Sequence, residues 1–161
     1  MKIVPGTLAL LILCGISAGC SHQISGGPES GVDMKRYRTY YIATDEPGDA
    51  TKAIEADLRA RGLSVSAGPA STVPPAADCK VLVKDKWMWD ITMYLLEVKL
   101  EMVDGRTGAM LASGRCYRTS VVRKPADVMV KEITDRIFGT TAEKTAAAAV
   151  VAPEGARAAA K

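Results

Sequence analysis

The segment Tyr94-Leu-Leu-Glu-Val-Lys-Leu-Glu-Met-Val103 decides the fold of this chain of 161 residues. Its even-numbered positions are all apolar or aromatic, and charged residues lie between them at positions 97, 99 and 101. Successive side chains of a strand point to opposite faces, so this alternation predicts a half-buried β-strand with its even-numbered residues inward. The glycine-containing loop Asp104-Gly-Arg-Thr-Gly108 follows, and it predicts a hairpin whose second strand runs from Ala109 to about Thr119.

Pairing Val103 with Ala109 across this loop makes large inward residues of the first strand face small residues of the second, among them Gly114. Small residues on that face allow a helix to pack closely against the sheet. On the outer face the same pairing places Glu97 opposite Arg115, a pair of opposite charges with a modest stabilising effect.

Further alternating segments predict strands, and two amphipathic segments predict helices. The additional elements are a strand over 36–43, a helix over 50–61, a short strand over 63–65, a strand over 79–86 and a helix over 125–138. Gly62 and Gly139 follow the two helices, where glycine commonly ends a helix. The order is β-α-β-β-β-β-α, which predicts an α+β fold with a mainly antiparallel sheet and two helices packed on one face.

The predicted single domain, residues 35–139, lies between two segments of different composition. Residues 20–34 are polar and rich in glycine, which predicts a flexible tether. Residues 140–161 are mostly alanine and lack the large apolar side chains whose burial offsets the entropy of ordering. They are expected to be a disordered Ala-rich tail. A frayed helix is the alternative, because alanine favours helix.

Residues 1–19 have the features of a secretory signal peptide. Lys2 supplies a positive start, the apolar run Leu8–Ile16 is too short to span a bilayer, and small residues precede Cys20. This pattern resembles the lipobox of bacterial lipoproteins, with Ser17 where leucine is usual. The resemblance implies that Cys20 becomes the acylated first residue of a lipid-anchored chain. The alternative is an ordinary cleaved signal, with Cys20 incidental.

The residue after Cys20 is Ser21 and not aspartate. In Gram-negative lipoproteins this resembles the sorting pattern for the outer membrane, which implies attachment to its periplasmic face. Triacylation, including the palmitate on the new amino terminus, provides more than two acyl chains and therefore stable anchoring. The formal net charge of +3 is too small to indicate nucleic-acid binding, so no nucleic-acid partner is expected.

Catalytic motifs are absent from the sequence. His22 is the only histidine and lies in the predicted tether, which excludes most hydrolase triads and histidine-based metal sites. Glu97 and Glu101 lie on the predicted outer strand face, where a solvated, ion-paired surface explains them better than a pair of catalytic carboxylates. We therefore expect a protein that is not an enzyme, with no catalytic residues, no metal and no cofactor.

Cys79 and Cys116 are the two cysteines of the predicted domain. The predicted strand positions separate them by two strands and four residues, about 16 Å, whereas a disulfide needs Cα atoms within about 7 Å. Two buried thiols are therefore favoured. A disulfide remains the alternative if a longer connection around residues 87–90 moves Cys79.

The segment Trp89-Asp-Ile-Thr-Met-Tyr-Leu95 has the pattern Trp-Asp-x-x-x-Tyr-Leu. It resembles small bacterial envelope lipoproteins that share this pattern and continue into a strand, an Asp/Gly turn, a second strand and a terminal helix. The resemblance covers about residues 79–139 and implies an envelope location and this fold. It implies no activity, because that domain has no assigned function.

Asp85, Trp87, Trp89 and Asp90 form a candidate binding rim. Trp87 continues the inward phase of the strand before it, which favours indoles that cap the core and an Asp90 that accepts backbone hydrogen bonds in a turn. The alternative is an exposed indole platform that holds a glycan strand or an aromatic side chain of a partner. Asp85 shares the inward phase, so it lies at the core edge or has a function.

These observations predict a lipid-anchored envelope protein with a non-catalytic binding or scaffolding role. Its partners are the membrane, through the lipid, and an envelope protein or glycan. A glycan or small-ligand binding module that uses the Trp87–Asp90 rim is the alternative function.

Overall fold

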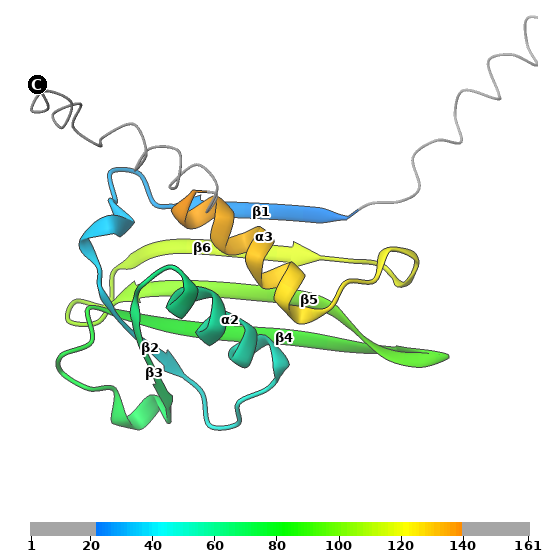
Figure 1. Cartoon of the computed structure of the whole chain (residues 1–161), viewed down its shortest axis with the longest axis horizontal. Coiled ribbons are helices and arrows are strands. Elements are labelled where there is room, and N and C mark those ends of the chain that lie inside the picture. Colours follow the sequence, from blue (N-terminus) through cyan, green and yellow to red (C-terminus); the bar gives the residue numbers. More distant parts are fainter. Residues whose placement is uncertain (1–21, 140–161) are drawn as a thin grey trace, which may run out of the picture.

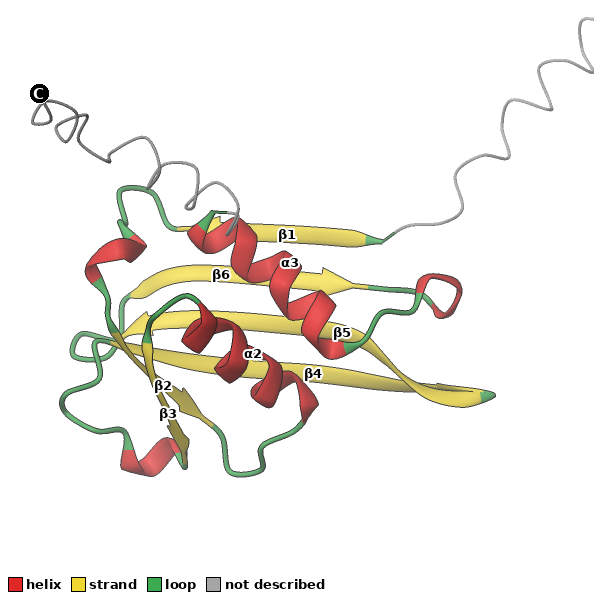
Figure 2. Ribbon diagram, viewed as in Figure 1, coloured by secondary structure: helices red, strands yellow, loops and turns green. Residues whose placement is uncertain are grey.

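A computed structural model describes residues 22–139 as a six-stranded mixed sheet with two helices packed against it (Figures 1 and 2). The strands are β1 (Gln23–Pro28), β2 (Thr39–Ala43), β3 (Ser64–Gly68), β4 (Cys79–Asp90), β5 (Thr92–Asp104) and β6 (Met110–Tyr117). The helices are α2 (Asp49–Ala60) and α3 (Ala126–Phe138), and short 3-10 turns occur at η1 (Met34–Arg36), η2 (Ala70–Thr72) and η3 (Ser120–Val122). The predicted signal peptide 1–19, Cys20 and the predicted tail 140–161 lie outside the described residues.

The strand order across the sheet is β1-β6-β5-β4-β2-β3. The β2-α2-β3 unit is parallel, β2 also runs parallel to β4, and the remaining neighbours are antiparallel. From β2 onward the chain follows the predicted order β-α-β-β-β-β-α, and the predicted α+β class is confirmed.

Strand β1 is an element that the sequence does not predict. It lies within the expected tether 20–34, yet it pairs along its length with β6 as an edge strand. Gly26 permits this approach, because a side chain there would collide with the backbone of Ser113 and Gly114. The prediction of a tether is therefore wrong for Gln23–Pro28. The strand is held by backbone pairing, which leaves no apolar pattern in the sequence.

The core lies between the helices and one face of the sheet (Figure 1). The even-numbered residues of β5 from Val98 to Met102 are fully buried, which confirms the predicted phase for this part of the strand. At the start of the strand the prediction is wrong, because a β-bulge shifts the pairing with β4 and Leu95, predicted to face outward, belongs to the core. The buried apolar residues that the helices contribute are Ala50, Ile54, Leu58, Met129, Val130, Ile133 and Ile137.

The β5–β6 register differs from the predicted one. Val103 pairs with Met110, and a β-bulge beside this pair makes Leu100 face Gly114. The shift at the centre is two residues, so the side chains from Ala112 to Cys116 keep their predicted faces, whereas Met110, predicted to face inward, is exposed opposite Val103. Gly114 lies directly under α3, where a Cβ atom would collide with Ile133. The close approach of a helix to small strand residues is therefore present.

The outer face of the sheet carries ion pairs. Arg115 donates to Glu97, although these residues are diagonal neighbours and not directly opposite each other. Lys84 lies 3.5 Å from Glu101 across the β4–β5 pair. These contacts fit a solvated, ion-paired surface, the interpretation that the sequence favours for both glutamates.

The two cysteines of the described residues are free and buried. Cys79 lies opposite Asp104 and Cys116 lies opposite Val98, so strand β5 separates them. Burial raises the pKa of Cys79 to about 12 and that of Cys116 to about 11. The thiols behave as small apolar core groups, as the strand positions predict.

Arg61, directly after α2, joins the two helices. Its guanidinium donates to Asp57 at 2.7 Å, to Asp135 at 2.6 Å and to the Thr134 hydroxyl at 3.0 Å, and it lies over the ring of Phe138. The Arg61 side chain is only 6% exposed. This arrangement joins the C-terminal ends of α2 and α3, and the first turns of both helices lie at the site described next.

Candidate binding groove and hairpin tip

Strands β4 and β5 continue as a twisted hairpin beyond the helices (Figure 1). The sequence predicts a connection at Trp87–Asp90, but these residues extend β4 to its end. The register shifts between Lys86 and Trp87, because Lys86 pairs with Glu97 and Trp87 pairs with Leu95. Such a β-bulge bends the strands and increases their twist, which turns the end of the hairpin relative to the rest of the sheet.

The prediction that the tryptophans cap the core is wrong, since Trp87 is 40% exposed and Trp89 is 68% exposed. The predicted inward phase is nevertheless correct, because Trp87 pairs with the buried Leu95 on the helix side of the sheet. Neither helix extends far enough along the sheet to cover this face. Beyond the groove that their first turns line, Trp89 and Ile91 at the end of the hairpin are exposed.

Asp85, the residue that did not fit the predicted core, is exposed at the start of this uncovered region. Its carboxylate accepts a hydrogen bond from the Trp87 indole Nε1 at 2.9 Å. Gly48, directly before α2, lies beside the same carboxylate. Asp85 therefore fixes the orientation of the Trp87 ring at the mouth of the space between the hairpin and α2.

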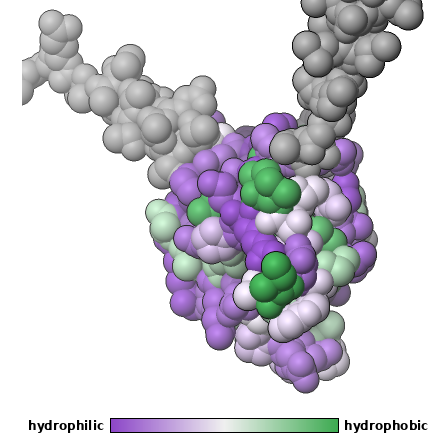
Figure 3. Space-filling view, turned by 90° about the vertical axis from the view of Figure 1, so that its right-hand side faces the viewer, coloured by the Kyte–Doolittle hydropathy of each residue, from purple (hydrophilic) through white to green (hydrophobic). Residues whose placement is uncertain are grey.

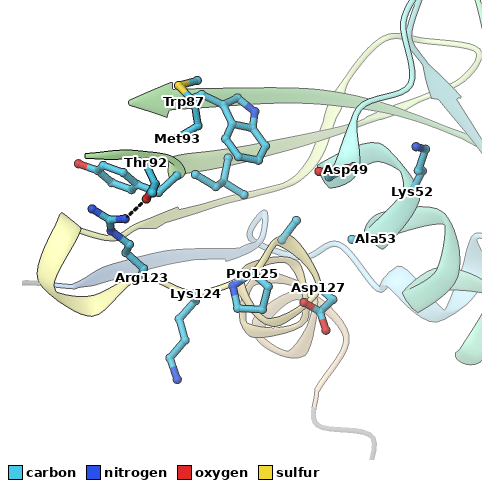
Figure 4. A pocket seen from close by; sticks show the side chains of 13 residues that line it. Asp49, Lys52, Ala53, Trp87, Thr92, Met93, Arg123, Lys124, Pro125 and Asp127 are labelled. Atoms are coloured by element: carbon cyan, nitrogen blue, oxygen red, sulfur yellow. Dashed lines mark hydrogen bonds between the residues drawn. The ribbon is translucent and has the colours of Figure 1, made fainter. Parts of the chain in front are cut away.

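Arg123 holds the end of the hairpin against the segment that precedes α3. Its guanidinium donates to the Thr92 hydroxyl (Figure 4). It also donates to the Asp90 carbonyl oxygen at 2.9 Å and stacks 4.5 Å from the centre of the Tyr94 ring. The Asp90 carboxylate lies 3.5 Å from the same guanidinium. The sequence does not predict this role of Arg123, because no motif links it to a hairpin tip some thirty positions earlier.

An open groove of about 790 Å³ lies between the hairpin and the first turns of both helices (Figure 4). Apolar side chains of the hairpin and the alanines of the two helices form most of its surface, and charged side chains surround them. The lining residues are Asp49, Lys52, Ala53, Trp87, Thr92, Met93, Tyr94, Leu95, Arg123, Lys124, Pro125, Ala126 and Asp127. Of the four predicted rim residues, only Trp87 lines this groove.

Beyond the groove, at the end of the hairpin, lie exposed apolar side chains that we call the apolar tip: Met88, Trp89 and Ile91. Ile91 is 88% exposed. Ile91 also has a backbone φ of +61°, a conformation that β-branched residues rarely adopt. Figure 3 views the molecule from the hairpin end and shows strongly apolar patches among polar surface.

The chemistry available at the groove is limited. Its lining contains neither histidine nor cysteine. Within residues 22–139, no group of three His, Cys, Asp or Glu side chains is placed to hold a metal ion. None of the described helices has the length and apolar character needed to cross a membrane.

Comparison with solved structures gives matches at the level of the fold. The PelC dodecamer from Paraburkholderia phytofirmans matches with a TM-score of 0.54 at 12% identity, over 73% of this chain and 99% of the PelC chain. The chain has a PelC-like fold. A point variant of the same PelC dodecamer gives a TM-score of 0.51 at 16% identity, over 74% of this chain and 96% of PelC. No protein-family model and no curated protein matches the sequence.

Proposed function

We propose that this chain is a lipid-anchored protein at the periplasmic face of the outer membrane that binds another envelope component and catalyses no reaction. The observation that carries the proposal is the groove beside Trp87. It is open, mostly apolar and held in shape by Arg123 and by the Asp85–Trp87 hydrogen bond.

The form of the groove suits recognition of a protein partner. Its volume of about 790 Å³ lies within the range of ligand pockets, about 300–1,000 Å³. An aromatic side chain in such a groove provides a large contact area, and the surrounding charges on Lys52, Lys124 and Asp127 fix orientation. An extended segment or a projecting side chain of an envelope protein fits this chemistry.

A glycan is the second candidate ligand, and the Asp85–Trp87 pair favours it. The hydrogen bond fixes the indole, and a fixed, exposed ring can stack on the C–H face of a sugar. The second oxygen of the Asp85 carboxylate can accept a sugar hydroxyl. The Trp87→Ala variant should lose binding of a protein partner under the first candidate and binding of a glycan under the second.

The anchor part of the proposal rests on Cys20, which lies three residues before β1. Replacement by alanine (Cys20→Ala) should release the protein from the membrane fraction, and globomycin should block its processing in wild-type cells. Membrane association that is unchanged in the variant contradicts the anchor.

Crosslinking in the native envelope followed by affinity purification tests the binding part. A partner whose recovery falls in Trp87→Ala but not in Met110→Ala supports the groove, because Met110 is exposed at the opposite end of β6. Recovery of glycan alone supports the second candidate. Because the matching PelC structures are dodecamers, this chain itself is one of the partners to be scored.

A further inference from the structure

We infer that the apolar tip docks on the same bilayer that holds the lipid of Cys20, so that the domain is attached to the membrane at two points. This inference rests on the proposed lipid anchor. It assigns the tip to the phospholipid surface and leaves the groove to the partner.

The chain enters the domain at the end of the sheet from which the hairpin extends. Gln23 pairs with Tyr117, Tyr117 with Glu97, and Glu97 with Lys86, so these four residues form one row across the sheet. Strand β1 runs away from this row, and β4 continues past it into the hairpin. The start of β1 and the hairpin tip therefore lie at the same end of the molecule (Figure 1).

The hairpin tip extends farther from this row than the segment that leads back to Cys20 can reach. Ile91 lies five residues beyond Lys86, about 16 Å along a strand. Cys20 lies three residues before Gln23, and three residues span at most about 10 Å. When the lipid of Cys20 is in the bilayer, the tip therefore extends at least as far toward the membrane as the chain that holds the domain.

The composition of the tip is typical of a segment at a membrane–water interface. Tryptophan is enriched at membrane–water interfaces, and apolar side chains beside it enter the boundary between headgroups and acyl chains. Asp90 is the only charged residue from Met88 to Met93, and Arg123 lies 3.5 Å from its carboxylate. The exposed cations Lys86 and Lys124 flank the hairpin, where they can meet lipid phosphates.

The backbone conformation of Ile91 is unfavourable, and nothing within the domain offsets it. A β-branched residue at φ +61° is strained, and an exposed isoleucine adds no burial within the domain. Glycine or asparagine would suit this position better if only the turn mattered. Contact with an apolar phase outside the domain accounts for the side chain.

Quenching by brominated lipid tests the inference on the lipidated mature protein. The protein is placed in vesicles of phosphatidylethanolamine and phosphatidylglycerol that contain a phosphatidylcholine brominated on its acyl chains. Because the chain has two tryptophans, Trp87→Phe leaves Trp89 as the only indole. The matched control is Trp87→Phe/Trp89→Phe/Met110→Trp, which places the only indole at the opposite end.

The inference predicts that Trp89 emission shifts to the blue and is quenched several-fold more than the indole at position 110. Equal quenching at the two positions, or none at either, overturns it. Flotation of the vesicles separates this result from failure of the anchor: a protein that does not float lacks the lipid, whereas one that floats without Trp89 quenching is anchored but not docked. Circular dichroism of each variant confirms that it is folded.

Discussion

A Gly114→Ala substitution should destabilise the domain although it adds only one methyl group. The methyl carbon would overlap Cγ2 of Ile133 and would lie 3.7 Å from Cδ1 of Ile137, so α3 must move away from β6. Overpacking of this kind costs about 1–3 kcal/mol. Removing a flexible glycine from the unfolded chain offsets up to about 1 kcal/mol. The expected net loss is about 1–2 kcal/mol.

Urea unfolding followed by circular dichroism measures this loss, and thermal unfolding should show a midpoint lower by roughly 4–8 °C for a domain of this size. Ser113→Ala is the matched control, because Ser113 is the partly exposed neighbour on the other face of β6. Its effect should stay within about 0.5 kcal/mol. A Gly114→Ala variant as stable as the wild type refutes the close packing of α3 on β6.

A double-mutant cycle identifies the atoms responsible. Ile133→Ala alone should cost about 2–5 kcal/mol, because it leaves a cavity in the core. If the new methyl group collides with Ile133, the Gly114→Ala/Ile133→Ala variant should be more stable than the two single losses predict when added. Simple additivity shows that the two side chains do not meet.

Three further predictions concern other parts of the domain. Arg61→Met should lower the free energy of unfolding by about 2 kcal/mol, because it removes the charge-assisted hydrogen bonds that the buried guanidinium makes with the partly buried carboxylates of Asp57 and Asp135. Arg59→Met at an exposed ion pair should change it by less than about 1 kcal/mol, and urea midpoints compare the two. The two buried thiols should not react with Ellman's reagent until the domain unfolds, and thiols that react freely in the folded domain contradict their burial. Because burial raises their pKa values from 9.0, the stability that the two thiols contribute is fully present below pH 9.0 and is lost as the pH rises toward 11 and 12. In the lipid-free protein, acrylamide should quench the fluorescence of Trp89 more strongly than that of Trp87. Variants that keep only one of the two tryptophans allow this comparison, and equal quenching contradicts the exposures of the two side chains.

The sequence predicts most of the fold because strand β5 has one buried face and one charged face. That difference fixes which side of β5 faces the helices, and even an error of two residues in the register leaves Gly114 on the correct face. Strand β1 could not be predicted in the same way. Its residues are glycine-rich and mostly exposed, and they join the sheet through backbone hydrogen bonds, which leave no apolar alternation in the sequence.

The exposure of the candidate site could not be predicted from the sequence, for a different reason. Strand periodicity gives the direction of Trp87 correctly, but exposure depends on how far the helices extend over the sheet. Helix α3 begins at Ala126, more than thirty residues later in the chain, and nothing in the hairpin sequence encodes where that helix will start. Arg123 was missed for the same reason, since its contacts with Asp90 exist only in the folded chain.

Photocrosslinking from Met93 in the native envelope tests the central claim, that the hairpin end is the binding end of this protein. Met93 is exposed and lines the groove, and Met110, equally a methionine but at the far end of β6, is the reference position. A photoreactive amino acid at Met93 should give a discrete adduct with an envelope component, the adduct should weaken in Trp87→Ala, and position 110 should give none. Identical adducts from both positions, or an adduct from position 110 alone, contradict the account.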